Sequence, residues 1–166
     1  MSKAYAGIGS RQTPEEYLRK FEELGKIFAE KGFTLRSGGA DGADSAFEIG
    51  CDEVNGPKEI FLPWKGFNGN ESPLFDPPKK AFELASKIHP GWHYLKQGAQ
   101  CLHARNCQQV LGTNLDDPVV FVVCYTPLDK GGTLQALRIA GQKKILIYNF
   151  YLEEYSFRTI LKNIKH

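Results

Sequence analysis

Short apolar segments alternate with longer segments of helical periodicity along the whole chain. Apolar runs of strand length predict five buried β-strands, at 3–9, 33–36, 59–64, 118–126 and 143–149. The run PVVFVVCYT at 118–126 is apolar almost throughout, which is typical of a strand that is buried on both faces of a parallel sheet.

Between these runs, apolar side chains recur at helical spacing. The clearest series is Tyr17, Phe21, Leu24 and Phe28. Thr13 and Glu16 have the spacing of a capping box around a proline at the first helical position, so this helix is predicted to begin after Thr13 and to end at Gly32. Further helices are predicted over 42–54, 79–89, 98–112, 131–142 and 151–164.

Strands and helices alternate without a repeat or a linker, and residues 65–78 form the one long loop. This order predicts a single α/β domain over 1–166: a Rossmann-like, doubly wound, mostly parallel sheet with helices on both faces. In such sheets, ligands bind at the carboxyl ends of the strands, where the strand order reverses.

Composition adds limits on the function. The net charge is +2, and no run of five basic residues occurs, which disfavours a nucleic acid as the partner. No apolar run has membrane-spanning length, and the N-terminus lacks the apolar core of a signal peptide. Four cysteines are too few for a disulfide scaffold. We therefore expect a cytoplasmic protein with reduced thiols and no membrane partner.

Three predicted strand-to-helix turns are rich in small residues: GIGSRQT at 7–13, SGGADGAD at 37–44 and DKGGTLQA at 129–136. Each leaves the carboxyl end of a strand and enters a helix, whose first N–H groups are unpaired and carry partial positive charge. The three turns together predict a crevice for an anionic, phosphate-bearing ligand. They match neither the P-loop nor the dinucleotide-binding glycine pattern.

The segments AGIGSRQTP, LRSGGADGADSAF and GGTLQALRIA, in this order, resemble the SLOG superfamily. Its Rossmann-like members include the DNA-processing protein A (DprA) family and the lonely-guy (LOG) cytokinin phosphoribohydrolases. FLPW and HARNCQQVLG look like a small bacterial and phage branch with an Arg-Asn motif. The resemblance covers roughly residues 4–147. It implies a nucleotide-derived ligand, and it implies a site role for Arg105 and Asn106.

One departure from the phosphoribohydrolase pattern bears on catalysis. These enzymes carry P-G-G-x-G-T-x-x-E with a catalytic glutamate, and Ala136 stands at that position here. This favours a non-catalytic binder, such as a sensor or a sequestering protein for a signalling nucleotide, including an immune signal if the protein is a phage product. The alternatives are a hydrolase of a nucleotide glycosidic or phosphate bond that uses Asp41, Asp44 or Glu48, and a DprA-like protein that handles DNA.

The residues of the predicted site come from the three turns and the Arg-Asn motif. The ligand-binding set is Gly9, Ser10, Arg11, Ser37, Gly38, Gly39, Asp41, Asp44, Arg105, Asn106, Gly131, Gly132 and Thr133. The glycines and Arg11 are expected to hold phosphate. Asp41 and Asp44 are expected either to bind ribose hydroxyls or only to cap the following helix.

Other residues invite weaker interpretations. The histidines and cysteines around 89–107 reproduce no zinc pattern, so neither a metal nor a cofactor is predicted, although His93 or His103 could serve as a general base. Trp64 or Trp92 would pack in the core or stack on a base. The apolar face of the C-terminal helix predicts a homo-oligomer. It comprises Tyr151, Leu152, Tyr155, Ile160 and Ile164.

Overall fold

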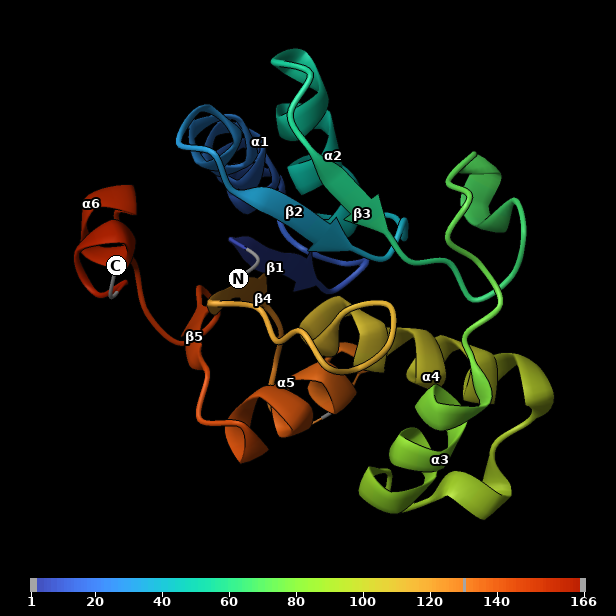
Figure 1. Cartoon of the computed structure of the whole chain (residues 1–166). Helices are drawn as coiled ribbons and strands as arrows, with labels where there is room; N and C mark the ends of the chain where they lie inside the picture. The colour runs from blue at the N-terminus through green and yellow to red at the C-terminus, as the bar shows by residue number, and fades with distance from the viewer. Residues whose placement is uncertain (1–2, 130, 165–166) are drawn as a thin grey trace.

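The computed structural model describes residues 3–129 and 131–164. Five strands form one all-parallel sheet in the order β3-β2-β1-β4-β5 (Figure 1). The strands are β1 (Ala4–Gly9), β2 (Thr34–Ser37), β3 (Lys58–Ile60), β4 (Phe121–Tyr125) and β5 (Leu146–Asn149). The predicted α/β, Rossmann-like fold with its doubly wound sheet is confirmed.

Helices cover both faces of the sheet. They are α1 (Glu15–Glu30), α2 (Ala43–Glu53), α3 (Lys79–Ile88), α4 (Gln97–Leu111), α5 (Thr133–Gln142) and α6 (Phe157–Lys162), with short 3-10 turns at Phe67–Gly69 and Trp92–Tyr94. α1, α2 and α6 pack on one face around an aromatic core that includes Phe21, Phe47 and Phe121. α3, α4 and α5 pack on the other face against smaller side chains such as Ala104 and Ala136 (Figure 1).

The strand order reverses at β1. From β1 the chain proceeds outward through β2 to β3 on one side, then crosses the sheet and continues through β4 to β5 on the other. The turns that leave β1 and β4 diverge to opposite faces, because α1 follows β1 and α5 follows β4. This divergence opens a crevice at the carboxyl ends of these two strands, where a ligand was predicted.

The start of α1 corrects the predicted capping box. Pro14, not Thr13, is the N-cap residue, and its carbonyl accepts the amides of Tyr17 and Leu18. Thr13 is buried, and its hydroxyl donates to the Ser10 carbonyl at 2.6 Å. The threonine therefore closes the turn after β1 instead of capping the helix.

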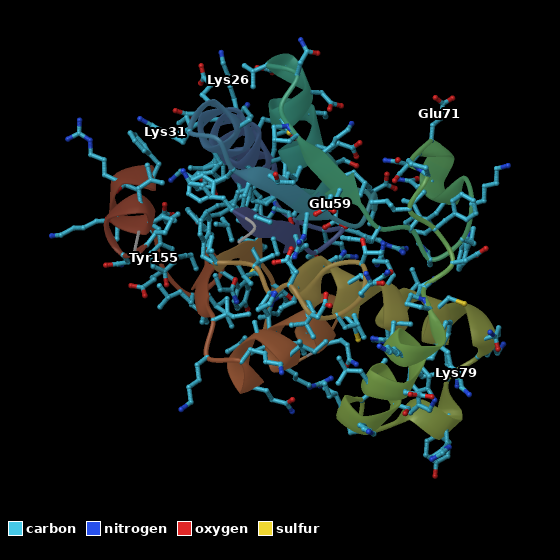
Figure 2. The ribbon with its side chains drawn as sticks, in the orientation of Figure 1. Lys26, Lys31, Glu59, Glu71, Lys79 and Tyr155 are labelled. Atoms are coloured by element: carbon cyan, nitrogen blue, oxygen red, sulfur yellow. The ribbon has the colours of Figure 1, made fainter. Side chains whose placement is uncertain are left out.

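The C-terminal segment also differs from its prediction. The helix is confined to Phe157–Lys162 and is capped by the Ser156 hydroxyl, which accepts the Thr159 amide. Ile160 is fully buried, and Tyr155, labelled in Figure 2, packs against the same core on the α1 face. Tyr155, Ile160 and Ile164 of the face that was predicted to form a dimer thus pack on the chain's own core, whereas Tyr151 and Leu152 are exposed. Oligomerisation stays an untested prediction.

The surface carries many charged side chains, although some large apolar ones, such as Tyr94 and Leu128, are also exposed. Lys26 and Lys31 extend outward from the α1 end of the molecule and Lys79 from α3 (Figure 2). None of the helices in the described part of the chain is long and apolar enough to cross a membrane.

Candidate functional site

A cavity of about 510 Å³ opens between the carboxyl ends of β1 and β4. We call it the switch-point cavity. It is lined by Ile8, Gly9, Ser10, Arg11, Gln12, Ala40, Asp44, Ala99, Leu102, His103, Arg105, Asn106, Gln109, Thr126, Pro127, Gly131, Gly132 and Thr133. Residues of all three predicted turns, together with the Arg-Asn motif, therefore converge on one concave surface, to which the second turn contributes Ala40 and Asp44.

The turn after β1 is fixed by its own backbone and by Ser10. The Ser10 amide donates to the Tyr125 carbonyl at 2.9 Å, which ties the turn to the end of β4. The Ser10 hydroxyl accepts the Gln12 amide at 3.0 Å. Ser10 thus shapes the turn. Arg11, which lies between Ser10 and Gln12, is exposed at the cavity wall.

The turn after β4 is held from both sides. Asn149, at the end of β5, accepts the Thr126 amide and donates to the Thr126 carbonyl at 3.1 and 2.8 Å. On the other side, the Asn106 amide group donates to the Gly132 carbonyl at 3.0 Å. The start of α5, with Gly131 and Thr133 on the cavity wall, is thereby placed with its first N–H groups at this rim.

Arg105 is a buried cation held in a single orientation. Its Nε donates to Asn106 Oδ1 at 2.9 Å, its Nη1 donates to the carbonyls of Gly38 and Phe61, and its guanidinium lies 5.5 Å from the centre of the Phe67 ring. Burial lowers its pKa to about 10, Asp44 opposes this shift, and repulsion from Arg11 adds to it. Arg105 and Arg11 therefore concentrate positive charge beside the cavity, which suits an anion.

Asp44 lies in the first turn of α2, directly after the loop that follows β2. Its carboxylate accepts the Gly9 amide at 3.2 Å and the Ala40 amide at 3.3 Å, and the Gly38 amide also contributes. Burial raises the pKa of Asp44 to about 6, although the charge of Arg105 and these amides act in the opposite direction. Asp44 is thus an internal anion that organises two turns, and its carboxyl titrates near neutral pH.

This arrangement corrects the role expected of the second turn. The amides of Gly38 and Ala40 interact with Asp44, so they are not free to cradle a phosphate. Gly39 has a φ of +69° and faces Leu62, away from the cavity. The Ser37 hydroxyl is fully buried and donates to the Gly7 carbonyl at 2.6 Å. Ser37, Gly38 and Gly39 therefore support the site from beneath but do not line its wall.

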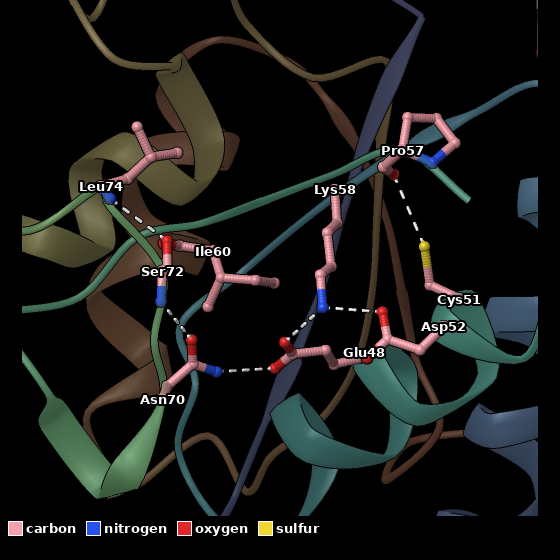
Figure 3. A network of polar contacts seen from close by, with 9 residues as sticks. All are labelled: Glu48, Cys51, Asp52, Pro57, Lys58, Ile60, Asn70, Ser72 and Leu74. Carbon is pink, nitrogen blue, oxygen red and sulfur yellow. Dashed lines mark hydrogen bonds and ion pairs between the residues drawn. The ribbon is translucent and has the colours of Figure 1, made fainter. Parts of the chain in front are cut away.

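Two of the three candidate catalytic carboxylates lie outside the cavity. Asp41 is exposed and accepts the Asn68 amide group at 2.9 Å. Glu48 is held in a polar network on the other side of α2, where it pairs with Lys58 at 2.9 Å and accepts from Asn70 at 3.0 Å (Figure 3). Asp44 is thus the one carboxylate on the cavity wall among the described residues, and neither Asp41 nor Glu48 lies beside it as a second carboxylate there.

The remaining alternatives are also placed. Of the two histidines considered as bases, His103 lines the cavity and His93 does not. Trp64 packs edge-on against Phe67, and Trp92 packs against the core of the α3 face. Neither indole is part of the cavity wall. Ala136 is fully buried in that same core, so the phosphoribohydrolase glutamate position is apolar interior here.

Sequence reasoning missed Gln109, which lies two residues before the end of α4, is only 3% exposed and lines the cavity. Its one available indication was position, since it lies four residues after Arg105 and so shares its face of the helix.

Three solved structures share the fold, whereas neither a family model nor a curated protein matches the chain. The structural genomics target TM1055 superposes with a TM-score of 0.55 at 19% identity, over 91% of this chain and 78% of that one. DprA from Helicobacter pylori gives 0.56 at 16% identity, over 88% and 64%. DprA from Streptococcus pneumoniae gives 0.50 at 16% identity, over 100% and 62%.

These neighbours are Rossmann-like proteins and agree with the resemblance to the SLOG superfamily. At such low identity they establish the fold alone. The chain spans less than two thirds of the length of each DprA protein.

Proposed function

We propose that the protein binds a nucleotide or nucleotide-derived small molecule in the switch-point cavity. The observation that carries this proposal is the convergence of Arg11, Arg105 and the start of α5 on one cavity. Two guanidinium groups and a helix N-terminus attract a phosphate from several directions at once. The cavity volume of about 510 Å³ suits a ligand of nucleotide size.

We propose further that the protein binds this ligand without turning it over. The phosphoribohydrolase-type glutamate is replaced by the buried Ala136, and the cavity wall offers a single carboxylate, Asp44, among the described residues. Asp44 is already engaged with two backbone amides. A protein of this kind would act as a sensor or a sequestering protein for its ligand.

One observation favours hydrolysis as a second candidate. The pKa of Asp44, raised to about 6 by burial, is close to that of an effective general acid or base at neutral pH. The candidates are separated by incubating the protein with nucleoside monophosphates, cyclic nucleotides and ADP-ribose, and by chromatography after denaturation. Intact ligand supports the binder, and a product would overturn it.

The central test of binding is Arg11→Ala. A charge-assisted hydrogen bond contributes ~1.5–3 kcal/mol, so we expect nucleotide affinity in isothermal titration calorimetry to fall roughly tenfold to a hundredfold. Arg11→Lys should recover part of this loss, because lysine keeps the charge without the planar fork. Arg19→Ala removes an exposed arginine of α1 outside the cavity and is the matched control.

Single-stranded DNA is the alternative ligand for the same titration. The Helicobacter pylori DprA structure is described by its mode of binding single-stranded DNA, which gives this chain a reason to be tested with an oligonucleotide. The net charge of +2 argues against such a partner. If Arg11→Ala weakens binding of a labelled oligonucleotide while no mononucleotide binds, the small-molecule proposal fails and DNA handling replaces it.

A further inference from the structure

The wall of the switch-point cavity combines two kinds of surface. Arg11 and Arg105 are suited to an anion, whereas Ala99 and Leu102 of α4 and Pro127 after β4 offer apolar contacts. A phosphate group makes no use of the apolar part of this wall. A ligand that fills the whole cavity therefore has a charged end and an uncharged, poorly hydrated part.

His103 stands beside this apolar part of the wall. Its ring packs against that of His89 at 4.4 Å between centroids, and its Nδ1 is buried with no hydrogen-bond partner in the described part of the chain. Burial lowers the pKa of His103 to about 4, and the positive charges of Arg138 and Arg105 act in the same direction as His89. The ring is therefore uncharged at neutral pH.

The environment of Nδ1 also selects the tautomer of the ring. A proton on Nδ1 would be a buried donor without an acceptor, which is unfavourable. The single proton of the neutral ring is then carried by Nε2. His103 thus carries an uncharged N–H donor and lines a cavity whose other side-chain donors include two cations, Arg11 and Arg105.

We propose that His103 is the specificity-determining residue of this cavity and donates its Nε2–H to a ring nitrogen or carbonyl oxygen of a nucleobase. Ala99 and Leu102 contact the base beside it. This inference rests on the proposed function and deepens it. Arg11 and Arg105 select the ligand by charge, and His103 selects among bases by the position of an acceptor.

The test compares AMP, GMP, CMP and UMP with ribose 5-phosphate, which keeps the phosphate and lacks the base. The wild-type protein should bind its preferred nucleotide at least about tenfold more tightly than ribose 5-phosphate. His103→Phe, which keeps an aromatic ring without the donor, should weaken the preferred nucleotide about 3–10-fold and leave ribose 5-phosphate unchanged.

Two further variants complete the series. His103→Gln should restore most of the affinity, because the glutamine amide nitrogen replaces the Nε2–H donor at a similar reach. His93→Phe changes an exposed histidine outside the cavity and should behave as wild type. Equal weakening of every ligand by His103→Phe would overturn a specificity role and leave only a structural one.

The remaining outcomes separate this inference from the proposed function. If all four nucleotides and ribose 5-phosphate bind equally, the inference fails while phosphate binding stands. If none binds, the proposed function fails and the inference falls with it. Nitrogen-15 NMR of the ligand-free protein is an independent check: we expect the Nε2–H tautomer for His103, and an Nδ1–H tautomer or an ordinary titration would overturn the proposal.

Discussion

At the scale of single residues, Asp44 explains why a glycine-rich turn carries an acid. A carboxylate in such a turn would repel a bound phosphate, but here it occupies the position that phosphate was expected to take. The loop amides bind an anion supplied by the chain itself. Under the proposed function, the ligand's phosphate is then left to Arg11, Arg105 and the start of α5.

Gly38 has a related role that does not depend on its amide alone. A Cβ at this position would lie 2.2 Å from Gln109 Nε2, 2.6 Å from Arg105 Nη1 and 2.8 Å from Asp44 Oδ2. The missing side chain is therefore what allows a buried carboxylate, a guanidinium and an amide to approach one another. No residue larger than glycine fits without displacing them.

Gly38→Ala should consequently damage the floor of the cavity. We expect a loss of about 1–3 kcal/mol in the free energy of unfolding, measured with urea, because overpacking forces buried side chains out of their rotamers. Gly98→Ala is the control, since its Cβ would meet only Trp64 at an ordinary 3.9 Å. It should be neutral or slightly stabilising within α4. Equal stability of the two variants would contradict the packing described here.

At the scale of elements, the hydrophobic pattern was sufficient to predict the five strands and six α-helices of the described residues except for their ends, and it missed the two short 3-10 turns. The ends depend on contacts that no local pattern contains. Thr13 has the sequence of an N-cap, but the Ser10 carbonyl takes its hydroxyl. The apolar spacing over 151–164 begins before the observed helix does. Tyr151 and Leu152 belong to that spacing, but they precede the Ser156 cap and are exposed.

The candidate site was predictable to the extent that topology determines it. Turns at the carboxyl ends of parallel strands must share a rim, so Arg11, Asp44 and Gly132 could be brought together from their order alone. The contribution of α4 could not be obtained in this way. Arg105 came only from a family resemblance, and Gln109 was missed, because buried polar residues on a helix do not show which of them face a cavity.

Helix α5 provides the prediction at this scale. Ala136→Glu restores the glutamate of the phosphoribohydrolase pattern, but it would place an unpaired carboxylate in an apolar core where Ala136 is 0% exposed. We expect a loss of roughly 3–5 kcal/mol in unfolding free energy and no gain of activity. Gln142→Glu adds the same charge to an exposed position of α5 and should change stability little. A stable, active Ala136→Glu protein would show that this position faces the ligand.

At the scale of the whole molecule, the small net charge of the chain does not reveal the local charge at the cavity. A net charge of +2 does not by itself predict anion binding, yet two arginines and a helix N-terminus converge on one cavity. The same cavity holds two groups, Asp44 and His103, whose pKa values are displaced in opposite directions by burial. Their effects on folding stability therefore oppose each other as the pH changes.

The last prediction uses this opposition. Asp44 has a pKa of about 6 in the folded protein against 3.8 in a model peptide, so the folded state binds more protons and Asp44 costs stability as the pH rises from 4 to 6. The full displacement corresponds to about 3 kcal/mol. His103 has a folded pKa of about 4 against 6.5, so it costs stability as the pH falls from 6.5 to 4.

Urea unfolding of the wild type, Asp44→Asn and His103→Gln at pH 4.5, 5.5 and 6.5 separates the two effects. The stability of the wild type relative to Asp44→Asn should decrease as the pH rises, and its stability relative to His103→Gln should increase. Asp41→Asn removes an exposed carboxyl from the loop just before α2 and provides the reference. Parallel trends in the two differences would mean that at least one of these groups is not buried as described, and the electrostatic account of the cavity would then fail.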